Sequence, residues 1–283
     1  MTKLISAGLA RLWKAKIFWF VMIAIVAISA FVIVNQYITS LSYEIVMSLN
    51  SFVLGYALVI VVAAPVFSSL FLGTEYSDGT VRNKLVVGHT RASIYAANLF
   101  VTIVSALLMC AAFFLTAFAV GLPLVGPLNL SDIGVLGFLA MILGTIFMVC
   151  AICAILTAIS MLVSNKAVSA IVSVLFMIGL LIFGIQIESR LLEPEFYSGY
   201  QFGTVTENGE PEFEEMMEKN PLFLTGTKRK VYEAVYDIVP GGQALQYANM
   251  KADHLWQMML YSMAITVVAS AFGYAVFRKK NIN

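Results

Sequence analysis

The sequence has little charge for its length. Charged residues make up 12% of the 283 positions and hydrophobic residues 60%, whereas an average soluble domain has about 25% charged residues. A soluble protein of this length would expose far more charge. Its apolar runs reach the roughly 20 residues that a helix needs to cross a bilayer, and the alternating segments typical of a β-barrel are not found. The composition therefore predicts an all-α polytopic membrane protein.

Motifs for nucleotide, metal or nucleophilic chemistry are also missing. The sequence has no GxxxxGKS/T, so the chain does not bind ATP through a P-loop of its own, and it has neither HExxH nor GxSxG. His89 and His254 are isolated, without a cysteine or carboxylate cluster at metal spacing beside them. Cys110, Cys150 and Cys153 lie inside apolar runs, where packing is the expected role. We therefore expect a protein that is not an enzyme and holds no metal or cofactor.

Ionisable residues are nearly absent from the apolar runs and lie at their edges instead. Carriers driven by protons or sodium commonly place carboxylates, histidines or lysines near the middle of the membrane. Their absence argues against proton coupling. It argues more weakly against sodium coupling, because backbone carbonyls alone can hold sodium. If the protein moves a solute uphill, we expect a separate motor to supply the energy.

The apolar runs predict six transmembrane helices. Lysine and arginine are concentrated before the first run, after the second and fourth, and after the sixth, whereas the short loops 39–45 and 122–132 have none. By the positive-inside rule, both ends of the chain lie on the cytoplasmic side, which we expect to be that of a bacterial plasma membrane. The approximate ranges of the helices are 17–38, 46–72, 93–121, 133–163, 167–187 and 255–277.

The chain is expected to divide into three parts. Residues 1–187 hold an N-terminal helix and the first five spans, residues 188–254 form an extracytoplasmic insert, and residues 255–283 hold the last span and a cytoplasmic tail. The insert is acidic in its first half, and its pattern predicts short helices from Glu210 to Lys219 and from Lys228 to Ile238. Because so short a segment builds only a small core, we expect a cap resting on the helix bundle.

Residues 1–16 predict an amphipathic helix in the plane of the lipid headgroups. Such a helix buries its apolar side in the membrane and turns its basic side toward anionic lipid. A charged flank that only sets topology is the alternative. With about 100° per residue, one arc carries Ile5, Leu9, Leu12 and Trp13, and the opposite arc carries Lys3, Arg11 and Lys14.

The most informative polar stretch is residues 73–91, between the second and third runs. It mixes acids and bases and is longer than a simple connection needs. We expect a short surface helix in which Asp78 caps the first backbone N–H groups and Gly79 permits close approach of a partner. The residues predicted to contact that partner are Glu75, Tyr76, Asp78, Gly79, Thr80, Arg82, Asn83 and Lys84.

This stretch resembles the cytoplasmic coupling segment of ABC-2 type exporter permeases. Residues 75–85 read EYSDGTVRNKL, which matches the family's acidic residue, Gly-Thr pair, and following basic and apolar positions. The family also has an N-terminal elbow helix, six spans, and an outer loop with a Pro-Gly turn, as at Pro240-Gly241-Gly242. Residues 88–91 depart from it, because the family often has a proline there.

The resemblance implies the permease subunit of an ATP-driven exporter. It implies a homodimer or heterodimer of permease chains, with the first and fifth spans as the two-fold interface, and two cytoplasmic ATPase subunits that bind the ATP. The apolar spans suit an amphipathic or hydrophobic substrate, such as an antimicrobial peptide, a drug or a lipid-like compound. The acidic insert favours a cationic peptide, although a solvated loop is the plainer interpretation. An ATP-independent secondary carrier or channel, and a membrane-embedded enzyme or assembly factor, are the alternatives.

Overall fold

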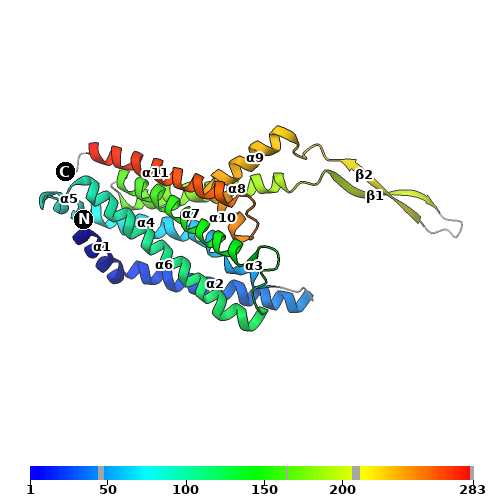
Figure 1. Cartoon of the computed structure of the whole chain (residues 1–283), viewed down its shortest axis with the longest axis horizontal. Helices are drawn as coiled ribbons and strands as arrows, with labels where there is room; N and C mark the ends of the chain where they lie inside the picture. The colour runs from blue at the N-terminus through cyan, green and yellow to red at the C-terminus, as the bar shows by residue number, and fades with distance from the viewer. Residues whose placement is uncertain (44–47, 164, 206–210, 281–283) are drawn as a thin grey trace.

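The computed structural model describes residues 1–43, 48–163, 165–205 and 211–280. Within these ranges, six helices are long and apolar enough to cross a membrane, which confirms the prediction of an all-α polytopic membrane protein. Figure 1 shows them as an elongated bundle. They are α2 (Lys16–Tyr43), α4 (Tyr56–Ser77), α6 (Arg91–Val125), α7 (Gly134–Leu162), α8 (Lys166–Leu191) and α11 (Leu255–Lys279).

The helices begin and end where the sequence supplies caps. The Thr90 hydroxyl accepts a hydrogen bond from the amide of Ser93 at the start of α6, and the Asn165 side chain accepts from the first amides of α8. Both satisfy donors that have no partner inside the helix. Gly126, with φ of 94°, ends α6 in a conformation that favours glycine. Local sequence therefore sets the length of these spans.

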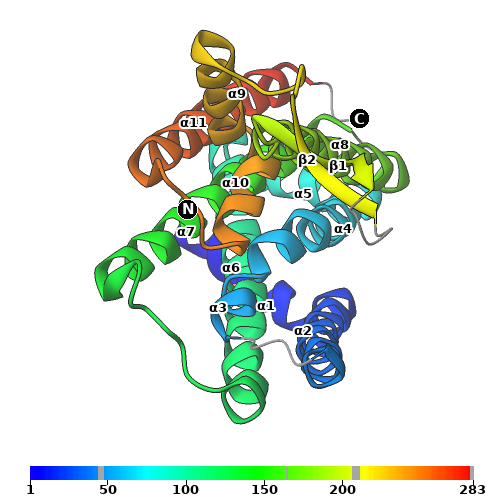
Figure 2. The same ribbon diagram turned by 90° about the vertical axis from the view of Figure 1, so that its right-hand side faces the viewer.

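The middle of the bundle is formed by α4 and α7. In the packing, α8 lies mainly on α4, α11 on α7, and α2 on α6. Figure 2 shows α2 and α11 at opposite edges of the bundle. Large apolar side chains on α2, α8 and α11 stay exposed, including Phe20, Leu175 and Val267. These three helices have surface left for lipid or for another chain.

Five short helices complete the helical part of the described ranges. At the end of the bundle near both chain termini, here called the terminal end, lie α1 (Thr2–Lys14) and α5 (Thr80–Val86) (Figure 1). Near the opposite end, here called the hairpin end, lie α3 (Asn50–Val53), α9 (Gly226–Ile238) and α10 (Pro240–Ala248). The predicted helix from Lys228 to Ile238 is thus confirmed as α9.

Pro240 begins α10, and Gly241 and Gly242 lie inside that helix. A Cβ atom on Gly184 of α8 would lie 2.7 Å from the backbone nitrogen of Gly242, and one on Gly241 would clash with the carbonyl of Leu180. The two glycines therefore let the backbones of α8 and α10 touch, and proline suits the first helical turn.

The predicted helix from Glu210 to Lys219 is wrong. Glu210 lies outside the described residues, and Pro211–Lys219 form strand β2, which pairs antiparallel with β1 (Phe196–Val205). Phe196 lies opposite Lys219, and Phe202 opposite Phe213. The aromatic and β-branched residues of β1 favour a strand, and pairing overrides the helix propensity of the Glu-Met run. The hairpin extends away from the bundle (Figure 1). Within the described part of the insert, α9 and α10 are the elements that pack on the bundle.

Candidate functional site

A buried carboxylate lies at the centre of the terminal end. Glu75, near the end of α4, is 2% exposed. Its Oε1 atom lies 2.6 Å from Nη1 of Arg11 and 2.6 Å from Nζ of Lys84, and its Oε2 accepts a hydrogen bond of 2.8 Å from Nδ2 of Asn98. These partners come from α1, α5 and α6. One carboxylate therefore joins four helices, and it is not on the surface where the docking prediction placed it.

The Arg11 side chain reaches inward to the buried Glu75, whereas the predicted arc placed it on the outer basic side of the helix with Lys3 and Lys14. Its guanidinium lies 3.9 Å from the ring centroid of Phe71. Burial lowers the pKa of Arg11, while the charge of Glu75 raises it; an arginine stays protonated at neutral pH in either case. Because α1 packs on α6, with Leu4 and Leu12 buried, Arg11 reaches a carboxylate that helical periodicity alone does not reveal.

The remaining predicted residues of α1 lie on the surface. Lys3 and Lys14 are exposed, and Trp13 is 51% exposed. The indole N–H of Trp19 donates to the carbonyl of Trp13 at 2.9 Å, and Phe18 packs edge-on against both rings. This aromatic corner joins α1 to α2, and indole rings in such a position are typical of the membrane–water interface.

Asp78 ends a helix, so the prediction that it starts one is wrong. The described chain continues α4 through Ser77, and the Asp78 amide donates to the carbonyl of Thr74 at 2.9 Å. Gly79 follows with φ of 65°, and its conformation separates α4 from α5. Glycine just beyond a helix end stabilises this left-handed turn. Glu75 and Tyr76 have their partners inside the bundle, and α4 continues to Ser77, beyond the predicted end of the second span at residue 72.

Tyr76 and the end of α11 are held together near the same carboxylate. The Tyr76 hydroxyl donates to the carbonyl of Met161 at 2.9 Å, and Nζ of Lys280 donates to that carbonyl at 3.0 Å. Burial lowers the pKa of Lys280. Arg91, at the start of α6, donates to the carbonyl of Phe277 at 2.7 Å. The ends of α4, α7 and α11 and the start of α6 therefore form one connected polar junction.

The outer side of α5 is exposed. Arg82 and Asn83 are exposed, and Val86 and Val87 are 79% and 77% exposed. The sequence prediction missed the two valines, although adjacent apolar residues in a polar loop were a visible signal. Of the eight predicted contact residues, Asp78, Gly79, Thr80, Arg82 and Asn83 reach the surface at least in part, and Glu75, Tyr76 and Lys84 turn inward.

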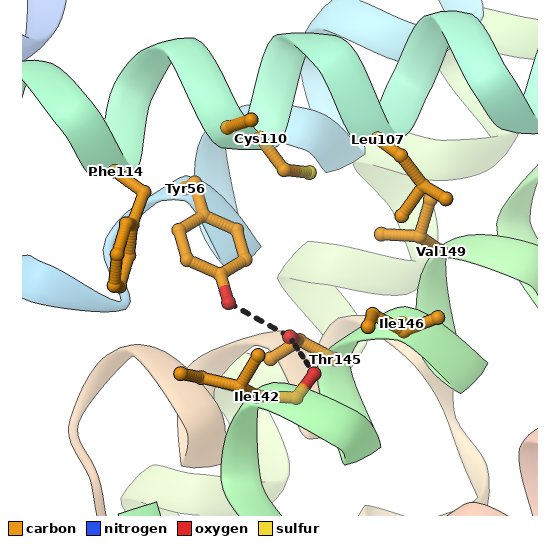
Figure 3. A pocket seen from close by; sticks show the side chains of 9 residues that line it. Tyr56, Leu107, Cys110, Phe114, Ile142, Thr145, Ile146 and Val149 are labelled. Atoms are coloured by element: carbon orange, nitrogen blue, oxygen red, sulfur yellow. Dashed lines mark hydrogen bonds between the residues drawn. The ribbon is translucent and has the colours of Figure 1, made fainter. Parts of the chain in front are cut away.

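An apolar pocket of about 300 Å³ lies between α4, α6 and α7 (Figure 3). Its polar pair is Tyr56 and Thr145, whose oxygens are 2.8 Å apart. Since Thr145 donates its proton to the carbonyl of Ile142, Tyr56 is the donor of this pair. A lining of this kind suits an apolar group. The other lining residues are Leu107, Cys110, Ala111, Phe114, Ile146 and Val149.

A larger apolar pocket, about 550 Å³ in volume, lies against α2, α4 and α8. Its walls include Phe20 and Ile25 of α2, Val62 of α4, and Leu181 and Ile185 of α8. This pocket opens on the side of the first and fifth spans, the pair that the family resemblance assigns to the dimer interface. Among the described residues, no group of three or more His, Cys, Asp or Glu side chains is placed to hold a metal ion.

Comparison with known families agrees with this architecture. Residues 11–282 match the profile of the ABC-2 family transporter proteins, so the match includes all six spans, α5 and the hairpin. Neither a curated protein nor a solved structure shows significant similarity to the chain. A family match over nearly the whole length settles the assignment: the chain belongs to the ABC-2 family of transporter proteins.

Proposed function

We propose that this permease subunit of an ABC transporter exports amphipathic or hydrophobic compounds. The observation that carries the proposal is the apolar pocket of about 550 Å³ between the first, second and fifth spans. Its walls are aliphatic and aromatic, as in most small-molecule sites. A peptide, drug or lipid-like compound has matching apolar surface to bury there, whereas an inorganic ion would lose its hydration shell without replacement.

The proposed orientation places the terminal end in the cytoplasm of a bacterial cell. Lysine and arginine at that end, in α1, α5 and the tail, favour the cytoplasmic side. Two ATPase subunits then bind ATP and dock on the outer side of α5. Exposed apolar residues rimmed by polar ones are typical of protein–protein contacts, and Val86 and Val87 beside Arg82 and Asn83 form such a patch.

In this proposal, the buried junction transmits the movement of the ATPase. Apart from the turn at Gly79, α5 is joined to α4 by the ion pair between Lys84 and Glu75. Arg11 extends the same contact to α1. A displacement of α5 therefore acts on α4, which lines both apolar pockets. An ATP-independent carrier or channel would have no use for this connection, and no specific observation favours it.

The docking proposal is tested by replacing Val86 and Val87 with glutamate. We expect the variant to insert normally and to lose at least tenfold in recovery of the ATPase subunit during co-purification, because the two carboxylates would be buried in the contact without a partner. A tenfold loss corresponds to about 1.4 kcal/mol. The matched control, Lys3→Gln with Lys279→Gln, changes net charge equally at exposed positions of the same end. Equal recovery from both variants would place the docking surface elsewhere.

The transport proposal needs a separate measurement. Wild-type complex in lipid nanodiscs should show ATPase activity that rises with amphipathic candidates and not with small hydrophilic ones. Ile25→Trp, which fills the larger pocket, should remove that stimulation while basal ATP hydrolysis stays. If no ATPase subunit ever co-purifies with the wild-type chain, the exporter proposal itself fails.

A further inference from the structure

A second feature of the terminal end is a basic pocket that docking does not explain. It has a volume of about 430 Å³ and lies where α1, α2, α4 and α8 meet. Its lining holds four cationic side chains, Arg11, Lys14, Lys16 and Lys166, and a single carboxylate, Asp78. Four positive charges from three helices thus converge on one cavity. Lys166 is far from the other three in sequence and meets them only in the fold. Such an excess creates a local field that attracts an anion.

Arg11 has hydrogen-bond donors to spare at this pocket. Nη1 is engaged with Glu75, but Nε and Nη2 are enclosed and find no hydrogen-bond partner in the described part of the chain. Enclosed donors without acceptors are costly. The planar guanidinium is suited to bind a phosphate through parallel hydrogen bonds. A phosphate in the pocket would be attracted by the charge of Arg11, whose side chain is 31% exposed, and would leave the bond between Arg11 and Glu75 in place.

The other walls of the pocket are apolar. Ala15, Ile17, Leu70 and Phe71 contribute them, so the cavity is amphipathic. The indole of Trp13 is one residue before Lys14, and it packs on Trp19 with ring centroids 5.8 Å apart. This pair is the aromatic corner described above, which is typical of the headgroup level of a membrane.

Apolar surface continues from the pocket along α2. Phe20 and Ile23 are 70% and 68% exposed, one turn and two turns beyond Lys16. A molecule with a charged head in the pocket could lay acyl chains along these side chains. A free inorganic anion would make no use of them, and neither would a carboxylate presented by a soluble partner.

We propose that this pocket binds the phosphate of an anionic phospholipid. The phosphate contacts Arg11 and the three lysines, and the acyl chains follow the exposed face of α2. Because Arg11 also holds Glu75, the bound lipid stabilises the junction between α1 and α4. This proposal concerns lipid binding alone, so it stands or falls independently of export and of ATPase docking.

The test uses the tryptophans as reporters. The chain has three tryptophans. Trp13 directly precedes the lining residue Lys14 and packs on Trp19, so Trp256→Phe leaves these two tryptophans as the reporters. The purified variant is placed in phosphatidylcholine nanodiscs that contain a small fraction of brominated phosphatidylglycerol or, in parallel, brominated phosphatidylcholine. We expect quenching by brominated phosphatidylglycerol at a mole fraction at least tenfold lower than by brominated phosphatidylcholine.

A matched pair of variants locates the effect. Lys14→Gln, Lys16→Gln and Lys166→Gln together remove three lining charges and spare the contact of Arg11 with Glu75. At roughly 1 kcal/mol for each basic residue near anionic lipid, the preference for phosphatidylglycerol should fall by up to about 100-fold. The control removes three exposed charges at the same end, through Lys3→Gln, Arg278→Gln and Lys279→Gln, and should keep the preference.

Three results would overturn the proposal. Equal quenching of the two triple variants would mean that general surface charge attracts the lipid. Displacement of brominated phosphatidylglycerol by millimolar inorganic phosphate would assign the pocket to a soluble anion. Loss of the ATPase subunit from the lining variant, with the lipid preference intact, would assign the lysines to a protein contact.

Discussion

At the scale of single residues, Glu75 is the side chain on which most of the terminal end depends. A carboxylate that is 2% exposed is stable only if it is paired, and Glu75 has Arg11, Lys84 and Asn98 as partners. Its position in the family-like segment made it look like a contact for another protein. The structure gives it an internal role, because three other helices supply the opposite charges and the donor amide.

Glu75→Gln should therefore destabilise the protein. Glutamine keeps the size of the side chain, but it leaves Arg11 and Lys84 without their negative partner. Since both partners keep some solvent contact, we expect a loss of about 2 kcal/mol, below the 3–5 kcal/mol typical of fully buried pairs. The check is thermal unfolding in detergent, with Glu233→Gln as the control because the Arg229–Glu233 pair is exposed and should matter by less than about 0.5 kcal/mol. Equal shifts in the two variants would contradict the prediction.

Asp237 plays a comparable part at the hairpin end. Its residue is 4% exposed, and its carboxylate accepts from Nε2 of Gln246 at 3.0 Å and lies 3.0 Å from Nδ1 of His254. Gln243 donates to the Asp237 carbonyl and accepts from Ser262. This network connects α9, α10 and α11. Burial raises the pKa of Asp237, although Gln246 and His254 act in the opposite direction.

A raised pKa gives stability a defined pH dependence. The folded state favours protonated Asp237, so this contribution is complete below the ordinary pKa of about 4 and is lost as the pH rises to the folded-state value. The asparagine variant lacks this titration. The free energy of unfolding of wild type relative to Asp237→Asn should therefore fall across that window and be constant above it. Denaturant unfolding at a series of pH values checks this, and a difference that does not change with pH would refute it.

At the scale of elements, the spans could be predicted and the pieces around them only in part. The run expected at 133–163 is α7, Gly134–Leu162. A run of more than about 20 apolar residues needs no knowledge of its neighbours to become a membrane helix. The strand β2 and the end of α4 do depend on neighbours. Strand β2 forms only with its partner strand β1, and the last turn of α4 depends on the cationic side chains around Glu75. Helix propensity and capping signals in the sequence were therefore insufficient to predict these two pieces.

The candidate docking site shows the same limit. Its location between the second and third spans followed from the sequence, because polar residues interrupt long apolar runs there. Which side chains face outward did not follow, since that depends on how α5 packs beneath Glu75. Lys84 turned out to be internal, and Val86 and Val87 turned out to be the exposed apolar patch.

At the scale of the whole molecule, some spans are covered by other helices of the chain and others are not. The covered ones are α4 and α7, and exposed apolar side chains are frequent on α2, α8 and α11. Gly273 of α11 already packs within the chain, where an added Cβ would lie 2.7 Å from Cβ of Ala158. Gly273 is therefore used inside the bundle. The apolar pocket between α2 and α8 has no such internal use, which favours that side for a second permease chain.

A cross-linking experiment separates these faces. In a chain with Cys110, Cys150 and Cys153 replaced by alanine, single cysteines at Leu175 and Ile182 of α8 are compared with one at Val267 of α11. In a two-fold dimer each residue near the axis meets its own copy, and a disulfide forms only where the two Cα atoms come within about 7 Å. Oxidation in native membranes should give dimers from the α8 positions, and monomers from Val267, which is as exposed as Leu175. Dimers from Val267 alone would move the interface to α11 and leave the pocket between α2 and α8 facing lipid.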